Sequence, residues 1–439
     1  MENNYLELLQ EAQLSLSRIT VYRNIFKDEI IIAYSDLINE LSSATPIVKQ
    51  LLSCYHQFLS LLINAYASDK QIIGDLWENH IINLVLTDEN VFSLACEKET
   101  DEEKYKGFLD IICFDLKQLH VLFKCNEKCL QNILESKTAI KTWPSYEIDY
   151  TNNIDSEMKN ILFMSEDWCN EMDKLKHYYY QFGCGAFSFF KAFRWNQQNI
   201  GGSLAGIESP DPIRLSQLIG YEKERSEVIT NTLQLIQGLP CNNILLYGDR
   251  GTGKSATVKA LLNEYAGCKL RLVEVSKYHL KDLPHIMESL QNRGIKFIIF
   301  IDDLSFESDE TSYRELKSVL EGGIEVKPQN VVIYATSNRR HLIKEYFSER
   351  SSGDEVSSQD TLQEKLSLSD RFGITITFSS PDKEKYLEIV EGLAKQRCLK
   401  IDTAELKTKA LQWEMWYNGR SPRTAKQFID HLEGELKLK

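Results

Sequence analysis

The first half of the chain has the apolar spacing of long amphipathic helices. Apolar residues recur every three or four positions across residues 51–66 and again across residues 109–123. This spacing places them on one face of a helix. Only Pro46 and Pro144 interrupt this half, and long stretches without proline favour helices. We therefore expect an all-helical domain over residues 1–195, with the aromatic cluster near its end serving as packing.

The second half instead alternates short β-rich runs with helical stretches. The runs cover residues 244–247, 270–275, 297–301, 331–335 and 374–378. Strands separated by helices predict crossover connections, and hence a mostly parallel sheet of five strands with helices on both faces. Residues 196–212, which contain glycine and proline, are predicted to be a linker before an α/β domain over residues 213–380. Only helical patterns follow, so residues 381–439 are expected to form a small helical subdomain.

The composition is that of a globular protein with reduced thiols. The chain has 439 residues, of which 43% are hydrophobic and 26% charged, and this excludes disordered and collagen-like classes. Its longest apolar runs are far shorter than the ~20 residues that cross a bilayer. The N-terminal sequence lacks a secretory-signal pattern, and the ten cysteines have neither disulfide-framework nor metal-site spacing. We therefore expect a cytoplasmic protein without membrane association.

The net charge of −13 is unevenly distributed along the chain. Residues 1–200 contain 18 basic and 29 acidic residues, a net of −11, whereas residues 201–439 contain 33 and 35, a net of −2. A protein that grips nucleic acid through its backbone needs a basic excess. The acidic first half therefore argues against direct nucleic-acid binding.

One eight-residue motif carries the clearest chemistry. Gly248-Asp249-Arg250-Gly251-Thr252-Gly253-Lys254-Ser255 fits the phosphate-loop pattern G-x-x-x-x-G-K-[ST] and lies between a predicted strand and a predicted helix. Its glycines let backbone N–H groups approach phosphate oxygens, toward which the helix N-terminus also points. Lys254 can reach the β- and γ-phosphates, and the Ser255 hydroxyl can hold Mg²⁺. We expect nucleotide contacts from the whole loop and from Ala256, which follows it.

Two carboxylates follow the most apolar predicted strand. Residues 297–301 are all apolar, and Asp302 and Asp303 come directly after them. Ligands collect at the carboxyl ends of the strands in open α/β sheets, so both acids should lie beside the phosphate loop. We expect Asp302 to hold Mg²⁺ and Asp303 to polarise the attacking water. The alternative is a solvated turn or a helix cap.

Together these motifs resemble those of AAA+ ATPases, and the resemblance covers about residues 210–439. The chain is most similar to a little-characterised bacterial AAA+ family of unknown function. Asn338 ends the run Tyr334-Ala335-Thr336-Ser337-Asn338 and matches the sensor-1 residue, which helps to orient the lytic water against the γ-phosphate. A cap on the following helix is the alternative role for Asn338.

The resemblance also implies two arginines that read the γ-phosphate. Arg371 resembles the arginine finger, which reaches the site of a neighbouring subunit and so requires a head-to-tail homo-oligomer, with a hexameric ring or spiral expected. A surface pair with Asp370 is the alternative. Arg423 resembles sensor-2, because Ser421 and Pro422 form a strong helix start just before it. Arg420 is the alternative for that role.

Three further residues, Ile219, Gly220 and Tyr221, resemble the AAA+ segment that packs on adenine, although ordinary packing explains them equally well. Two features depart from the family pattern. Many AAA+ proteins have Glu where Asp303 stands, so slow turnover is one consequence, and Glu307 offers a substitute. No aromatic pore loop follows the second predicted strand of the α/β domain, where Tyr278 is interpreted as a packing residue.

These features predict an ATP-binding AAA+ protein that hydrolyses ATP to ADP and phosphate with Mg²⁺. Hydrolysis is expected to change the angle between the sheet and the C-terminal lid, and the helical N-terminal domain to transmit that change to a protein partner whose identity the sequence does not give. Two alternatives remain: a nucleotide-dependent switch or assembly scaffold with little hydrolysis, and a DNA-associated loader or remodeller.

Overall fold

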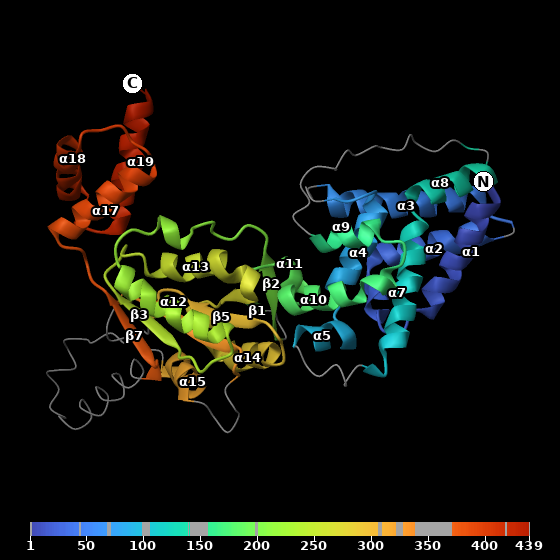
Figure 1. Ribbon diagram of the computed structural model, residues 1–439, viewed down its shortest axis with the longest axis horizontal. Coiled ribbons are helices and arrows are strands. Elements are labelled where there is room, and N and C mark those ends of the chain that lie inside the picture. Colours follow the sequence, from blue (N-terminus) through green and yellow to red (C-terminus); the bar gives the residue numbers. More distant parts are fainter. Residues whose placement is uncertain are drawn as a thin grey trace. The chain divides into compact units, whose positions relative to one another are not determined.

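The computed structural model divides the chain into two compact units, residues 1–189 and residues 190–439 (Figure 1). Each unit is described by itself. The structure describes residues 2–43, 45–67, 72–98, 106–138, 140, 157–197, 201–305, 310–321, 328–338, 371–417 and 419–438.

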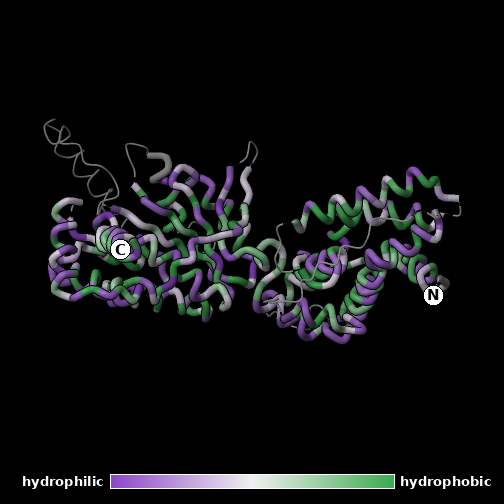
Figure 2. The backbone as a smooth tube through the Cα atoms, turned by 90° about the horizontal axis from the view of Figure 1, so that it is seen from above, coloured by the Kyte–Doolittle hydropathy of each residue, from purple (hydrophilic) through white to green (hydrophobic). Residues whose placement is uncertain are grey.

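The first unit is all-helical in its described residues, as the apolar spacing predicts. Its core is built around Trp77, which stacks on Tyr34 with 3.8 Å between the ring centroids and meets Phe58 edge-on. Apolar and polar positions alternate along these helices (Figure 2). The helices are α1 (Glu2–Arg18), η1 (Arg23–Lys27), α2 (Glu29–Ser42), α3 (Val48–Tyr66), α4 (Leu76–Thr87), α5 (Val91–Glu97), α7 (Leu109–Lys124), α8 (Glu127–Thr138), α9 (Glu157–Met164), η2 (Trp168–Glu171), α10 (Met172–Phe182) and α11 (Ala186–Phe189).

A buried carboxylate ties two parts of this unit together. Asp115 of α7 is fully buried and accepts hydrogen bonds from the backbone N–H groups of Thr20, Val21 and Tyr22, at 2.6–3.1 Å. These three residues form the turn between α1 and η1. These backbone donors satisfy the buried carboxylate.

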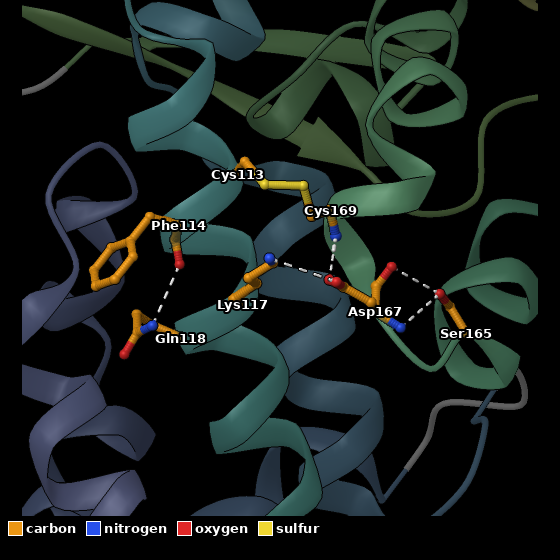
Figure 3. The surroundings of a disulfide bond; sticks show 7 residues. All are labelled: Cys113, Phe114, Lys117, Gln118, Ser165, Asp167 and Cys169. Carbon is orange, nitrogen blue, oxygen red and sulfur yellow. Dashed lines mark hydrogen bonds and ion pairs between the residues drawn. A yellow bond between two sulfur atoms is a disulfide. The ribbon is translucent and has the colours of Figure 1, made fainter.

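A disulfide joins Cys113 of α7 to Cys169 of η2 (Figure 3). The Asp167 side chain caps η2 by accepting from the Cys169 N–H at 2.9 Å, and Lys117 lies 3.7 Å from the other oxygen of Asp167. This bond departs from the expectation of reduced thiols. The two cysteines are 56 residues apart in sequence, so their spacing carries no signal of the pairing.

The second unit is built on a seven-stranded sheet. The strand order is β2-β1-β4-β5-β6-β3-β7, and all neighbours are parallel except the antiparallel pair β1 and β2. The strands β3 to β7 are the five predicted runs, so the predicted α/β fold class is confirmed. The strands are β1 (Ala192–Gln197), β2 (Gly202–Ile207), β3 (Ile244–Gly248), β4 (Leu270–Glu274), β5 (Lys296–Ile301), β6 (Val331–Ser337) and β7 (Ile374–Phe378).

The β1–β2 hairpin is the main difference from the sequence-based boundaries. Two strands of the sheet are formed by residues 192–197 and 202–207. The expected boundaries instead place these residues in a helical domain that ends at 195 and a linker at 196–212. Phe193 and Trp195 of β1 are buried, and Gly202 of β2 lies against the Trp195 ring, where a Cβ atom would come within 2.2 Å of it. Gly202, which reads as part of a loose connection, is therefore required by close packing on Trp195.

Helices cover the sheet and form the lid that follows it (Figure 1). Sheet residues such as Phe378 share one apolar core with lid residues such as Tyr386, Ile389 and Phe428. Among the described residues, no helix combines the length and apolar character that a membrane crossing requires. The helices are η3 (Leu215–Gln217), α12 (Glu222–Ile236), α13 (Lys254–Tyr265), η4 (Ala266–Cys268), η5 (Lys277–Asp282), α14 (Leu283–Gln291), α15 (Glu310–Glu321), and, in the lid, α17 (Lys383–Gln396), α18 (Thr403–Trp416) and α19 (Pro422–Leu438).

Candidate functional site

The phosphate-loop motif forms the corner between β3 and α13. Gly248, Gly251 and Gly253 have φ angles of 133°, 79° and 97°, a region that favours glycine. At Gly248 a Cβ atom would lie 2.1 Å from the carbonyl oxygen of Phe378 on β7, so no other residue fits. Thr252 closes the loop by donating its hydroxyl hydrogen to the Asp249 carbonyl at 2.8 Å.

Lys254 starts α13 and is 6% exposed. Its Nζ atom donates to the carbonyl oxygens of Gly248 and Asp249, at 2.8 and 2.7 Å, and to Oδ1 of Asn338 at 3.2 Å. Burial lowers the pKa of Lys254, and the nearby acids Asp249, Asp302 and Asp303 act in the opposite direction. The ammonium group therefore lies inside the loop, where backbone oxygens hold it.

Both predicted carboxylates lie beside this loop. Oδ1 of Asp302 accepts from the Ser255 hydroxyl at 2.6 Å, and Oδ1 of Asp303 accepts from Nδ2 of Asn338 at 2.6 Å. The strand order explains this proximity: β6, which leads to Asn338, lies between β5, which leads to the two acids, and β3, which leads to the phosphate loop. The structure thus brings together five residues that the sequence analysis singled out.

A large cavity lies over the loop and extends to the lid. Its volume is about 1160 Å³, and residues 250–256 and both acids line it. Arg423 and Lys426 of the lid line the cavity too, and the Arg423 N–H donates to the carbonyl of Gly251 at 3.1 Å. Apolar side chains line another part of the cavity: Ile213, Leu218, Ile219, Ile389 and Leu393.

The residues expected to contact adenine have different surroundings in the structure. Ile219 lines the cavity, whereas Tyr221 is 3% exposed and stacks on Phe378 of β7 with 5.3 Å between the ring centroids. The Tyr221 hydroxyl donates to the carbonyl of Ser379 at 2.6 Å. Neither Gly220 nor Tyr221 belongs to the lining of this cavity, so the packing alternative describes Tyr221.

Arg225 holds this segment in place and was missed by the sequence analysis. Its guanidinium group donates to the carbonyl oxygens of Leu218, at 2.9 Å, and of Gly220. Burial lowers the pKa of Arg225, while Glu222 acts in the opposite direction. An arginine on a helix with several charged residues has no distinguishing pattern in a single sequence.

The other predicted arginines have different surroundings. Arg420 forms an ion pair with Glu414 at 2.8 Å and does not line the cavity, so the geometry favours Arg423 for the lid contact. Arg371 forms an ion pair with Glu321 at the end of α15 and is likewise outside the lining. Asp370 and Glu307 lie outside the described residues.

Tyr278 differs from its expected packing role. It is 76% exposed, and the ammonium of Lys277 lies 5.6 Å from the centre of its ring. The interpretation of Tyr278 as a packing residue is therefore wrong. It occupies η5, at the carboxyl end of β4.

Comparison with known proteins gives a family and a set of distant structures. No curated protein matches the chain. The chain is similar to a single-residue variant of Thermotoga maritima RuvB, with 19% identity, 52% of this chain and 66% of that chain covered, and a TM-score of 0.38. It is also similar to the Thermotoga maritima RuvB Holliday junction branch migration motor, with 18% identity, the same coverage and a TM-score of 0.37. The chain thus spans 66% of the length of these solved structures.

A family model described as a protein of unknown function, DUF815, matches residues 188–436. The match begins within two residues of the second compact unit and covers its sheet, phosphate loop and lid. It agrees with the predicted resemblance to a little-characterised family of unknown function. Because the match covers more than half of the 439 residues, the chain belongs to the DUF815 family.

Proposed function

We propose that the protein is a cytoplasmic, Mg²⁺-dependent AAA+ ATPase. The observation that supports this most directly is the convergence of Lys254, the Ser255–Asp302 pair and the Asp303–Asn338 pair on one cavity at the phosphate loop. These are the group types that phosphoryl transfer requires: a cation for the phosphates, oxygen ligands for a metal and a carboxylate for water.

The residues present fit Mg²⁺. The Ser255 hydroxyl and the exposed Asp302 carboxylate are 2.6 Å apart at the edge of the cavity, and Mg²⁺ prefers a small number of protein oxygen ligands together with phosphate and water. Ser255 and Asp302 would hold the ion. When bound, it neutralises the negative charge that develops on the phosphate oxygens.

Each remaining residue has a role that its position supports. Lys254 exchanges the carbonyls of Gly248 and Asp249 for the β- and γ-phosphates of ATP. Asp303 polarises the attacking water by accepting a hydrogen bond from it, and Asn338 holds the Asp303 carboxylate. Arg423 brings the lid to the γ-phosphate, so that conversion to ADP and phosphate alters the contact between the lid and the loop.

Turnover requires a second copy of the chain in this proposal. Arg371 does not line the cavity of its own chain and supplies its guanidinium group to a neighbour in a homo-oligomer, most simply a hexameric ring. The helical N-terminal unit passes the lid movement to a protein partner. The Cys113–Cys169 disulfide is unusual for a cytoplasmic protein, and its redox state in cells tests the location.

A second candidate function is an ATP-dependent switch or assembly scaffold with little hydrolysis. Two observations favour it: Asp303 is one methylene shorter than the usual Glu, and its carboxylate is already bound by Asn338. A DNA-associated loader or remodeller is less well supported, because residues 1–200 have a net charge of −11.

The experiment measures ATP affinity, phosphate release and particle size with and without ATP–Mg²⁺. Lys254→Ala should weaken ATP binding by ~100-fold or more, since it removes charge-assisted contacts to two phosphates. The matched control is Lys281→Ala, which changes an exposed lysine of η5. Equal ATP affinity in wild type and Lys254→Ala would refute the proposal. ATP-dependent assembly without phosphate release would favour the switch.

The proposed role of Arg371 as an arginine finger has its own test. Arg371→Ala should bind ATP normally and lose turnover. Mixing it with Asp303→Ala subunits should restore part of the turnover, because some interfaces then combine an intact Asp303 with an intact Arg371. No recovery in mixtures that co-assemble would contradict transfer of the arginine between subunits.

A further inference from the structure

Thr336 of β6 connects the two acids of the site. It is 2% exposed, and its hydroxyl group donates to Oδ1 of Asp302 at 2.6 Å and accepts from the backbone N–H of Asp303 at 3.0 Å. A hydroxyl has one hydrogen to donate and two lone pairs, so it can make both bonds at once. One buried oxygen thereby contacts the side chain of the first acid and the main chain of the second.

The backbone at Asp303 needs such support. Its φ angle is 51°, in the left-handed region that residues with a Cβ atom rarely adopt. Two further bonds join the same turn to β6: the Leu304 N–H donates to the Thr336 carbonyl at 2.7 Å, and the Ser337 hydroxyl donates to the Leu304 carbonyl at 2.8 Å. Asp303 itself is contacted through its backbone N–H, which donates to the Thr336 hydroxyl at 3.0 Å and, at a longer 3.2 Å, to Oδ1 of Asp302.

The left-handed turn has a consequence for the short acid. In this conformation Oδ1 of Asp303 lies 2.6 Å from Nδ2 of Asn338, whose Oδ1 atom in turn binds Lys254. The main-chain turn, which Thr336 stabilises, thus places an aspartate carboxylate beside the sensor and the phosphate-binding lysine.

The Asp302 side chain is fixed by the same hydroxyl. Oδ1 of Asp302 accepts from both Thr336 and Ser255, each at 2.6 Å. Thr336 therefore orients the carboxylate that shares a candidate Mg²⁺ site with Ser255, and does so from a buried position that is outside the reach of bulk water.

We infer that Thr336 is a positioning residue for ATP hydrolysis, which holds the metal-binding acid Asp302 and the water-orienting acid Asp303 in one arrangement through a single hydroxyl group. The inference rests on the proposed function. It predicts that metal response and turnover change together when this hydroxyl is removed, while nucleotide binding without metal does not change.

The test compares Thr336→Val, which keeps the shape and removes the hydroxyl, with Thr336→Ser, which keeps the hydroxyl. In Thr336→Val we expect the Mg²⁺ concentration for half-maximal activity to rise ~10-fold and kcat to fall ~10- to 100-fold, because the bond to the Asp302 carboxylate and the shorter of the two bonds from the Asp303 N–H are lost. ATP affinity in EDTA should stay within twofold of wild type. Thr336→Ser should remain within threefold of wild type in all three quantities.

Two further variants sharpen the comparison. Thr377→Val changes an exposed threonine of β7 and controls for the introduction of valine into the sheet. Thr336→Ala also lacks the hydroxyl, adds no bulk, and replaces Thr336→Val if that protein does not fold. If the wild type binds ATP but barely hydrolyses it, the readout is the ratio of the ATP affinity with Mg²⁺ to the ATP affinity without Mg²⁺. This ratio should fall in the variants that lack the hydroxyl.

The outcomes separate the two claims. If Thr336→Val or Thr336→Ala has the kcat and the Mg²⁺ dependence of wild type while Lys254→Ala is inactive, the role of Thr336 is overturned and the ATPase proposal stays intact. Loss of the Mg²⁺ response in Thr336→Ser as well would mean that the methyl group matters, and would also overturn the inference. A wild type that does not bind ATP overturns both.

Discussion

The link between Asn338 and Asp303 gives the sharpest prediction for turnover. Asn338→Ala removes the donor that lies 2.6 Å from the Asp303 carboxylate and the acceptor that lies 3.2 Å from the Lys254 ammonium. The Lys254 contact is longer, and Lys254 keeps two carbonyl partners in the loop. The loss therefore falls mainly on Asp303, whose carboxylate becomes free to rotate.

The size of the effect follows from that one contact. A hydrogen bond to an ionised group contributes ~1.5–3 kcal/mol, which corresponds to a decrease of ~10- to 150-fold in kcat if the bond acts in the transition state. ATP affinity should change less than threefold, because the phosphates are held by Lys254 and the loop. Thus kcat and the dissociation constant for ATP should respond differently.

The assay is steady-state phosphate release at saturating ATP–Mg²⁺, together with calorimetric ATP binding. Asn292→Ala, which changes an exposed asparagine at the end of α14, is the matched control. A kcat within twofold of wild type would refute the reasoning. An ATP affinity that falls as much as kcat would show instead that Asn338 acts in binding.

Three predictions concern the helical unit. Burial against Trp168 lowers the pKa of His120 to about 4, below its unfolded value of ~6.5. The free energy of unfolding should therefore reach its full value above pH ~6.5 and decrease by up to ~3 kcal/mol as the pH falls toward 4. In urea titrations, His120→Leu should flatten this pH dependence. Asp115→Ala removes the acceptor that three backbone N–H groups share, of which that of Tyr22 is buried, and should cost ~2–5 kcal/mol in urea unfolding. Asp110→Ala, at an exposed position of the same helix, should cost less than ~0.5 kcal/mol. Cys113→Ser should lower stability by ~2–4 kcal/mol, and a reducing agent should have the same effect on wild type and none on the variant.

The sequence was most informative where one residue type is physically required. Gly248 fits its corner because a Cβ atom would overlap with Phe378, and Asp302 and Asp303 lie at the site because they end a strand that is buried on both faces. These requirements leave local patterns in the chain. Contacts between distant segments leave none, which is why Thr336 and Arg225 escaped notice although both hold parts of the cavity.

Tyr221 and Tyr278 illustrate a related limit. Both are tyrosines close to glycine or basic residues, yet one is buried under β7 and the other is 76% exposed. Burial of an aromatic ring depends on which strand or loop lies over it, and that is decided by the topology of the sheet. The amphipathic pattern predicts a helix face well, but it gives little information for single residues in connecting segments.

The hairpin of β1 and β2 determines where a shorter protein should begin. A fragment that starts near residue 210, where the motif resemblance starts, would lack both strands, and the backbone of β4 that now pairs with β1 would become an open sheet edge. Open edges recruit strands from other molecules, so such a fragment should self-associate. A fragment that starts at residue 190 keeps β4 paired with β1 and is the better choice for isolating the α/β half in solution.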